Sequence, residues 1–237
     1  MTQGSTQRPA AIIIGSNGAI GGALASAIEE EATHDVIRVA RAGGDIAADL
    51  TDPAALDAMA QRIAGEGRDI RRVFIATGLL HRDGRGPEKS IADLDADWLI
   101  ENYRANALGP LLVAAAILPL MPRTGSWTTA ILSARVGSIS DNSLGGWYGY
   151  RMAKAALNMA IRNLAVEWRR KNDRAIIVGL HPGTVDSPLS KPFQGRVAPG
   201  KLFDPERAAL QLLDVVEALK PADSGRLFAW DGSEIAP

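Results

Sequence analysis

Short apolar runs alternate along the chain with stretches in which apolar residues recur every three or four positions. The first run, Ala10–Ile14, is wholly apolar and rich in β-branched residues, which is typical of a strand buried on both faces of a parallel sheet. Similar runs predict strands at 36–40, 45–50, 72–76, 128–132, 175–180 and 227–230. Helical periodicity covers 19–31, 53–64, 95–120, 150–170 and 205–219.

This alternation predicts a single α/β domain over residues 10–237, preceded by a flexible N-terminal segment at 1–9. Its fold class is a Rossmann-like, doubly wound parallel sheet of about seven strands with helices on both faces. One connection departs from the pattern, because residues 41–44 are too few for a helical crossover between parallel strands. The helix there is either absent or replaced by a tight loop.

Two loops have the composition of functional segments. Residues 81–89 are rich in glycine and charge, and residues 181–201 contain four prolines together with several glycines and serines. Loops of the second length are uncommon in compact domains and often close over a substrate. We therefore expect 181–202 to be a substrate lid, with a surface insertion as the alternative.

Composition and charge exclude several classes of protein. The 237 residues are 46% hydrophobic and carry a net charge of -1, which predicts a globular chain without a nucleic-acid surface. Cysteine is absent and the three histidines are far apart, so neither disulfides nor a metal site are expected. No apolar run approaches the roughly 20 residues of a membrane span, and the first residues lack a signal core. We expect a cytoplasmic protein without membrane contact.

A glycine-rich turn follows the first strand directly and opens a helix. It runs from Gly15 to Gly21 and includes Asn17, Gly18, Ala19 and Ile20. Gly15 makes the sharp turn, Gly18 and Ala19 allow close approach of a pyrophosphate, and Gly21 packs the helix on the sheet. The turn predicts dinucleotide binding.

The end of the second strand indicates which dinucleotide binds. NAD-binding domains usually place Asp or Glu there to hold the ribose 2′-hydroxyl. Here Ala40 is followed by Arg41, whose guanidinium can pair with a 2′-phosphate. NADP(H) is therefore favoured over NAD(H), unless Arg41 is only a solvated loop cation.

Tyr150 and Lys154 are spaced one helical turn apart, so both side chains project from one helix face. A phenol has an ordinary pKa near 10, and a neighbouring ammonium lowers that pKa by favouring the phenolate. Such a pair can give a proton to a carbonyl oxygen as hydride arrives. An ordinary surface aromatic beside a solvated lysine is the structural alternative.

Taken in order, these motifs resemble the short-chain dehydrogenase/reductase family over nearly the whole chain. The stretch from Ser133 to Asn142 and the following Gly145–Tyr148 look most like its C-factor-like and small carbonyl reductase subgroup. Asn106 and Gly109 resemble the family's Asn-x-x-Gly. The remaining residues that the resemblance assigns to the cofactor are Asp49, Leu50, Ala76, Thr77, Gly78, Pro182, Gly183, Val185 and Ser187.

The resemblance also implies roles at the reacting centre. Tyr150 would be the general acid and base, Lys154 would bind the ribose and tune Tyr150, and Asn106 would help to hold a proton-relay water. The family's catalytic serine falls on Ala134, which cannot donate a hydrogen bond. Ser138 is the first candidate to replace it, and Ser133 is the second, although strand alternation points Ser133 to the opposite side.

The sequence therefore predicts an NADP(H)-dependent oxidoreductase that moves hydride between nicotinamide and a small carbonyl or alcohol substrate. The alternative is a catalytically weak NADP(H)-binding sensor or signalling protein on the same fold, which the alanine at 134 suggests. From the resemblance we also expect a homodimer or homotetramer paired through the helices at 95–120 and 150–170.

Overall fold

The computed structural model describes residues 8–237, apart from the side chain of Arg196. Residues 1–7 of the expected flexible segment lie outside that range. Arg8, by contrast, is held to the start of the sheet, because its guanidinium forms an ion pair with Asp35 at 2.7 Å and donates to the carbonyl of Ala32. The flexibility expected for 1–9 stays a prediction.

Eight strands form one sheet in the described part of the chain, in the order β10-β9-β6-β5-β4-β1-β2-β3. All neighbours are parallel except β9 and β10, which run antiparallel at one edge. The expected fold class is confirmed, with β10 added to the seven expected strands. The bounds are β1 (Ala10–Ile14), β2 (Asp35–Ala40), β3 (Ile46–Ala47), β4 (Ile70–Ile75), β5 (Trp127–Leu132), β6 (Ala175–His181), β9 (Leu227–Ala229) and β10 (Glu234–Ile235).

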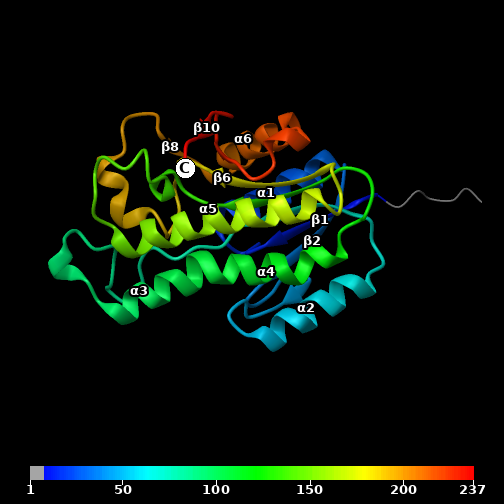
Figure 1. Cartoon of the computed structure of the whole chain (residues 1–237), viewed down its shortest axis with the longest axis horizontal. Helices are drawn as coiled ribbons and strands as arrows, with labels where there is room; N and C mark the ends of the chain where they lie inside the picture. Colours follow the sequence, from blue (N-terminus) through cyan, green and yellow to red (C-terminus); the bar gives the residue numbers. More distant parts are fainter. Residues whose placement is uncertain (1–7) are drawn as a thin grey trace, which may run out of the picture.

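Helices cover both faces of the sheet (Figure 1). On one face, α1 (Ala19–Glu31) and α6 (Pro205–Ala218) pack together over residues such as Ile13, Phe74 and Val178. On the other face, α2 (Pro53–Gly65), α4 (Gly109–Ile117) and α5 (Tyr148–Arg169) cover the alternate side chains of the same strands. Because both faces are buried, the strands read as continuous apolar runs.

No helix connects β2 to β3, which settles the question left open by the short 41–44 connection. Gly43 and Gly44 take positive φ angles of 73° and 76°, a conformation that glycine adopts without a steric penalty. The Asp45 N–H then donates to the Arg38 carbonyl at 2.9 Å. The chain thus turns back tightly, and β3 is shorter than the expected strand at 45–50.

The expected long helix at 95–120 is continuous but irregular. It consists of α3 (Ala96–Tyr103), a π-helical segment η2 (Arg104–Leu108), α4, and a final 3₁₀ turn η3 (Leu118–Leu120). Pro110 lacks the N–H that would bond to the carbonyl four residues earlier, which favours a break in the regular pattern at this point. Sequence periodicity alone does not detect such a π segment.

By length and apolar composition alone, Ala96–Leu120 also resembles a membrane-spanning helix. This corrects our expectation that no segment approaches such a span. In this fold, however, 44% of its most apolar window is buried, and the helix lies beside α5 in Figure 1. We interpret it as a core helix of the domain.

The expected lid at 181–202 is an ordered segment with short elements of its own. It contains β7 (Thr184–Val185), the 3₁₀ turn η5 (Lys191–Arg196) and β8 (Leu202–Phe203), and β7 pairs with β8 in a separate two-stranded sheet. The remaining short turns are η1 (Ile91–Asp93), η4 (Arg135–Gly137) and η6 (Pro221–Asp223).

Candidate active site

The glycine turn packs against the end of β4. Gly15 has a φ of 83°, and a Cβ placed there would lie 2.6 Å from the Ala76 carbonyl oxygen. A Cβ on Gly21 would meet the Gly15 carbonyl oxygen at 2.2 Å, so neither position accepts a larger residue without movement. The turn therefore brings the predicted segments Gly15–Gly21 and Ala76–Gly78 together.

The start of α1 is free to accept an anion. Its N-cap residue, Gly18, provides no side-chain hydrogen bond, and the first turn carries no acidic residue. The first N–H groups of a helix lack partners within the helix, and together with the helix dipole they attract phosphate. The residues present thus fit the pyrophosphate of a dinucleotide.

The β2–β3 loop lies beside this turn. Asn17 Nδ2 donates to the Ala42 carbonyl, and Ser16 Oγ donates to the Val39 carbonyl at 3.2 Å. Arg41 lies in the chain between Val39 and Ala42. It is exposed and has no hydrogen bond or ion pair within residues 8–237. The nearby Arg38 is instead paired with Glu29 at 2.8 Å, so Arg41 is the guanidinium available to a ligand.

Asp49 lies beyond this loop on the same edge of the sheet. Its carboxylate accepts hydrogen bonds from the backbone N–H and the hydroxyl of Thr51, at 2.9 and 2.7 Å. These hydrogen bonds, helped by the charge of Arg41, lower the pKa of Asp49 below its ordinary value. Asp49 therefore stays charged at neutral pH.

Tyr150 and Lys154 project from the inner face of α5 and are both buried, at 9% and 2% exposure. Lys154 Nζ donates to the Leu132 carbonyl at 2.9 Å and lies 5.8 Å from the centre of the Tyr150 ring. Burial raises the pKa of Tyr150 to about 12 and lowers the pKa of Lys154 to about 7. The structure of the protein alone does not support our expectation that Lys154 lowers the pKa of Tyr150, because desolvation dominates at both groups.

Asn106 is completely buried in the π segment η2. Its Nδ2 donates to the Leu79 carbonyl at 2.7 Å, and its Oδ1 accepts from the Leu79 N–H at 2.9 Å. The side chain thus fixes the chain just after β4 and is already satisfied there. Any contact of Asn106 with a water molecule would have to come from its backbone.

The hydroxyls near the alanine at 134 are engaged elsewhere. Ser133 Oγ donates to Asn158 Oδ1 at 2.6 Å, as strand alternation predicts for a side chain facing α5. Ser138 Oγ accepts from the Asp141 N–H at 3.1 Å and does not line the cavity that holds Tyr150. Ser133 and Ala134 do line that cavity, so of the two candidate serines only Ser133 borders it.

A cavity of about 530 Å³ lies at the carboxyl ends of β5 and β6. Tyr150 borders it, together with Ile20 from the glycine turn and the predicted Pro182, Gly183, Val185 and Ser187. Trp147 at the start of α5 and Phe193 of the 181–202 segment also line it, with their ring centres 5.2 Å apart. The cavity therefore joins the predicted catalytic, cofactor and lid residues.

Sequence reasoning missed several polar residues at this cavity and around it. His181 lines the cavity, and burial, followed by the charge of Arg135, lowers its pKa to about 4, so it is neutral at physiological pH. Its position next to Pro182 was the only signal that could have identified it. Glu88, buried against the start of α5, carried no motif at all.

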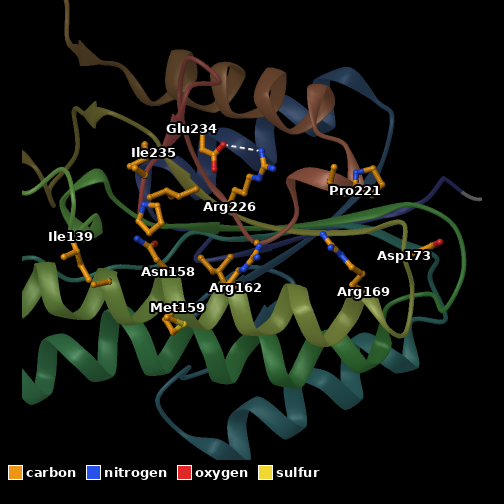
Figure 2. Close-up of a pocket in the computed structure, with 18 residues that line it drawn as sticks. Ile139, Asn158, Met159, Arg162, Arg169, Asp173, Pro221, Arg226, Glu234 and Ile235 are labelled. Atoms are coloured by element: carbon orange, nitrogen blue, oxygen red, sulfur yellow. Dashed lines mark hydrogen bonds and ion pairs between the residues drawn. The ribbon is translucent and has the colours of Figure 1, made fainter.

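A second, larger groove of about 920 Å³ lies between α5 and the last residues of the chain (Figure 2). Arg162 and Arg169 extend into it from α5, and Arg226 and Glu234, which form an ion pair at 3.2 Å, also line it. None of the predicted site residues lines this groove. The predicted site residues that line a cavity therefore lie at the smaller one.

Comparisons with known proteins agree with this geometry. The family described as Enoyl-(Acyl carrier protein) reductase matches residues 19–211. The 1-hydroxy-2-glutathionyl-2-methyl-3-butene dehydrogenase of Rhodococcus sp. (strain AD45) is 29% identical over 94% of this chain and 96% of its own length. The C-signal of Myxococcus xanthus is 36% identical over 62% of this chain and 82% of its own length.

A solved structure shows the same fold. The NADPH-bound carbonyl reductase from chicken fatty liver superimposes with a TM-score of 0.82 at 22% identity, covering 98% of this chain and all of that one. The order of the sequence motifs, the topology of the sheet and the family match all indicate the same family. The chain belongs to the short-chain dehydrogenase/reductase family, where it is similar to the C-signal protein, and is an oxidoreductase.

Proposed function

We propose that this oxidoreductase is an NADP(H)-dependent carbonyl reductase or alcohol dehydrogenase in which Tyr150 is the general acid and base. The observation that carries the proposal is the meeting of Tyr150 with the Pro182–Ser187 segment on one cavity wall. The cavity lies at the carboxyl ends of parallel strands, where open α/β sheets bind their ligands. Residues 10–237 would act as one domain in this reaction.

The choice of NADP(H) rests on Arg41 and on the start of α1, where no side chain caps the first N–H groups. The free N–H groups at the helix start would hold the pyrophosphate, and Arg41 would hold the 2′-phosphate. The nicotinamide would supply or accept a hydride at the substrate carbon. The groups that would hold the remainder of the cofactor are Asp49 and Leu50 at the adenine, Ala76, Thr77 and Gly78 along the ribose, and Pro182, Gly183, Val185 and Ser187 at the nicotinamide amide.

Tyr150 is suited to giving up a proton in the direction of carbonyl reduction. Because burial raises its pKa to about 12, its hydroxyl is protonated throughout the neutral range. It would donate that proton to the carbonyl oxygen while the carbon accepts hydride, which leaves a phenolate to be reprotonated. In alcohol oxidation the same oxygen takes the proton back.

Lys154 and Asn106 would complete the proton path. The Lys154 ammonium uses one of its three donors on the Leu132 carbonyl, which leaves two for a ribose hydroxyl and for Tyr150. Pro110 offers no N–H to the Asn106 carbonyl, which would accept a hydrogen bond from a relay water.

The substrate we propose is a small carbonyl or alcohol compound with an apolar body. Leu80, Val136, Trp147 and Phe193 form an apolar wall around Tyr150. The alternative, a weakly catalytic cofactor sensor, is not favoured, since the matching family and the full-length relative are named as a reductase and a dehydrogenase.

The direct test is to add purified protein and NADPH to a panel of aldehydes, ketones and quinones and to follow absorbance at 340 nm, the NADPH band. We expect oxidation of NADPH with at least one apolar carbonyl compound. NADPH binding without turnover on any member of the panel would favour the sensor.

We also propose that the chain pairs as a homodimer or homotetramer in the cytoplasm. Apolar side chains stay exposed on the outer faces of the two helices expected to pair, namely Ile100, Tyr103, Leu108, Leu112, Met152, Met159 and Val166. Exposed apolar side chains on these two helices favour association. Sedimentation equilibrium would give the mass of the assembly.

A further inference from the structure

A buried carboxylate, Glu88, lies against the start of the helix that carries Tyr150. Its side chain is 3% exposed, and its Oε2 accepts a hydrogen bond from the Gly149 N–H at 3.1 Å. Its backbone carbonyl also accepts from the Trp147 N–H. Two donors at the start of α5 therefore bond to one residue of the distant 81–89 segment.

The helix α5 lacks a cap of its own. Its N-cap residue, Trp147, has a φ of 51° and makes no side-chain hydrogen bond, and the first turn contains no acidic residue. Helices usually satisfy their second or third N–H with an oxygen from the N-cap side chain. Gly149 is the second residue of α5, so Glu88 takes over the function of the missing cap.

Gly149 is packed closely between Glu88 and Leu99. A Cβ on Gly149 would lie 3.0 Å from Glu88 Oε1 and 3.1 Å from Leu99 Cδ2. Oε1 itself is buried without a hydrogen-bond partner in the described residues. A buried oxygen without a partner is disfavoured, although the positive end of the helix dipole offsets part of that cost. The single hydrogen bond of Oε2 to the start of α5 is therefore the contact that ties this buried carboxylate to the helix.

The segment that carries Glu88 is itself fixed. Asp93 Oδ2 accepts from the N–H groups of Lys89 and Ser90, both at 3.0 Å, in a capping box at η1. Glu88 therefore projects from an ordered support. Tyr150 directly follows Gly149, so the position of its hydroxyl depends on where this first turn is held.

We propose that Glu88 is a positioning residue for the proposed reaction: its carboxylate caps the first turn of α5 and so holds Tyr150 in place for proton transfer. The inference rests on the proposed function for its catalytic part. The placement of Tyr150 depends on this hydrogen bond and on the length of the Glu88 side chain, and not on its charge. A displacement of the proton donor by about 1 Å is enough to lower a catalytic rate by orders of magnitude.

Two conservative variants distinguish the effect of side-chain length at Glu88 from the effect of its charge. Glu88→Gln keeps the length and an acceptor oxygen but removes the charge, whereas Glu88→Asp keeps the charge and loses one methylene of reach. Asp52→Ala is the matched control, because Asp52 Oδ1 caps α2 by accepting from the Ala54 N–H at 3.0 Å, away from Tyr150. For each protein we would measure kcat, the KM for NADPH, and amide hydrogen exchange at the starts of α2 and α5.

For Glu88→Asp we expect kcat to fall about tenfold or more with the KM for NADPH nearly unchanged, and faster exchange at Gly149 and Tyr150. Glu88→Gln should keep kcat within about threefold and retain protection, because the cap hydrogen bond survives. Asp52→Ala should speed exchange only at the start of α2 and leave kcat unchanged.

Equal losses of kcat in Glu88→Gln and Glu88→Asp would overturn the proposal, as would unchanged exchange at the start of α5 in Glu88→Asp. Faster exchange with full activity would also overturn it, because the cap would then not position Tyr150. If the wild-type protein turns over no carbonyl compound, the proposed function fails. The exchange measurement still decides in that case whether Glu88 caps α5.

Discussion

Asn106 and Leu79 are joined by two hydrogen bonds, in which the Asn106 amide both donates to and accepts from the Leu79 backbone, at 2.7 and 2.9 Å. Leu79 follows the end of β4, which also packs against the glycine turn through Ala76. One buried side chain therefore connects the π segment of the long helix to the cofactor side of the sheet. The same π segment also packs against α5, the helix that carries Tyr150.

Replacing Asn106 with alanine should destabilise the protein by about 3 kcal/mol, because two buried backbone groups of Leu79 lose their partners. Urea unfolding followed by circular dichroism measures this. Asn142→Ala is the control, since Asn142 is exposed and accepts a single hydrogen bond from Gly145. A loss below about 1 kcal/mol for Asn106→Ala would mean that other groups or water replace the amide.

Arg41→Ala should weaken NADPH binding by about tenfold to a hundredfold while changing NADH binding little. A guanidinium that pairs with a phosphate contributes on the order of 1.5–3 kcal/mol, and NADH has no 2′-phosphate. Titration of both cofactors by fluorescence gives the two affinities. Equal losses for NADPH and NADH would assign the 2′-phosphate to another group.

The strand and helix pattern predicted the fold well because both faces of the sheet are buried. The run at Ala10–Ile14 and the helix at 19–31 coincide with β1 and α1. The short strands at the two edges of the sheet and the irregular part of the long helix were harder to predict. β3 and β10 have only two residues each, too few for a periodic signal, and the π segment at Arg104–Leu108 keeps the same apolar pattern as a regular helix.

Ala134→Ser should raise kcat by about tenfold. Ala134 is buried on the cavity wall in the same apolar cluster as Tyr150, and a hydroxyl there would add a hydrogen-bond donor for the reacting oxygen. Removing one such hydrogen-bond donor from other enzymes lowers the rate by a factor of about 10²–10³. Adding a donor at Ala134 should therefore recover part of that factor. Steady-state kinetics of both proteins test this. A fall in kcat with unchanged NADPH binding would place the reacting oxygen elsewhere.

Lys154 should make stability depend on pH. Burial lowers its pKa from 10.5 to about 7, so between these values the unfolded chain binds more protons than the folded protein, and stability rises with pH. Lys154→Met removes this buried charge and should be more stable than wild type by about 2 kcal/mol at pH 6.

That difference should shrink steadily as the pH approaches 9.5. The pKa of Tyr150, which burial raises from 10 to about 12, affects stability only above this range and acts on both proteins. Urea unfolding of the two proteins from pH 6 to 9.5 gives the comparison. A gap that stays constant with pH would show that Lys154 keeps its charge when buried.

The site could be predicted from sequence where a residue belongs to a spaced motif. Tyr150, Ile20 of the glycine turn and residues of the Pro182–Ser187 segment line one cavity, and Lys154 Nζ lies 5.8 Å from the centre of the Tyr150 ring. The pKa of Tyr150 could not be predicted, because desolvation depends on what packs around the ring. Glu88 was missed for a similar reason: it acts on α5 from 61 positions away, and only the fold reveals that contact.

The central claim is that the Tyr150 hydroxyl transfers the proton, and Tyr150→Phe tests it most directly. Tyr148→Phe, two residues earlier on the same helix, is the matched control. With a carbonyl substrate found in the panel, we predict that Tyr150→Phe lowers NADPH oxidation by about a hundredfold or more while its affinity for NADPH changes less than about threefold. Tyr148→Phe should keep the wild-type rate. Full activity in Tyr150→Phe would contradict the account.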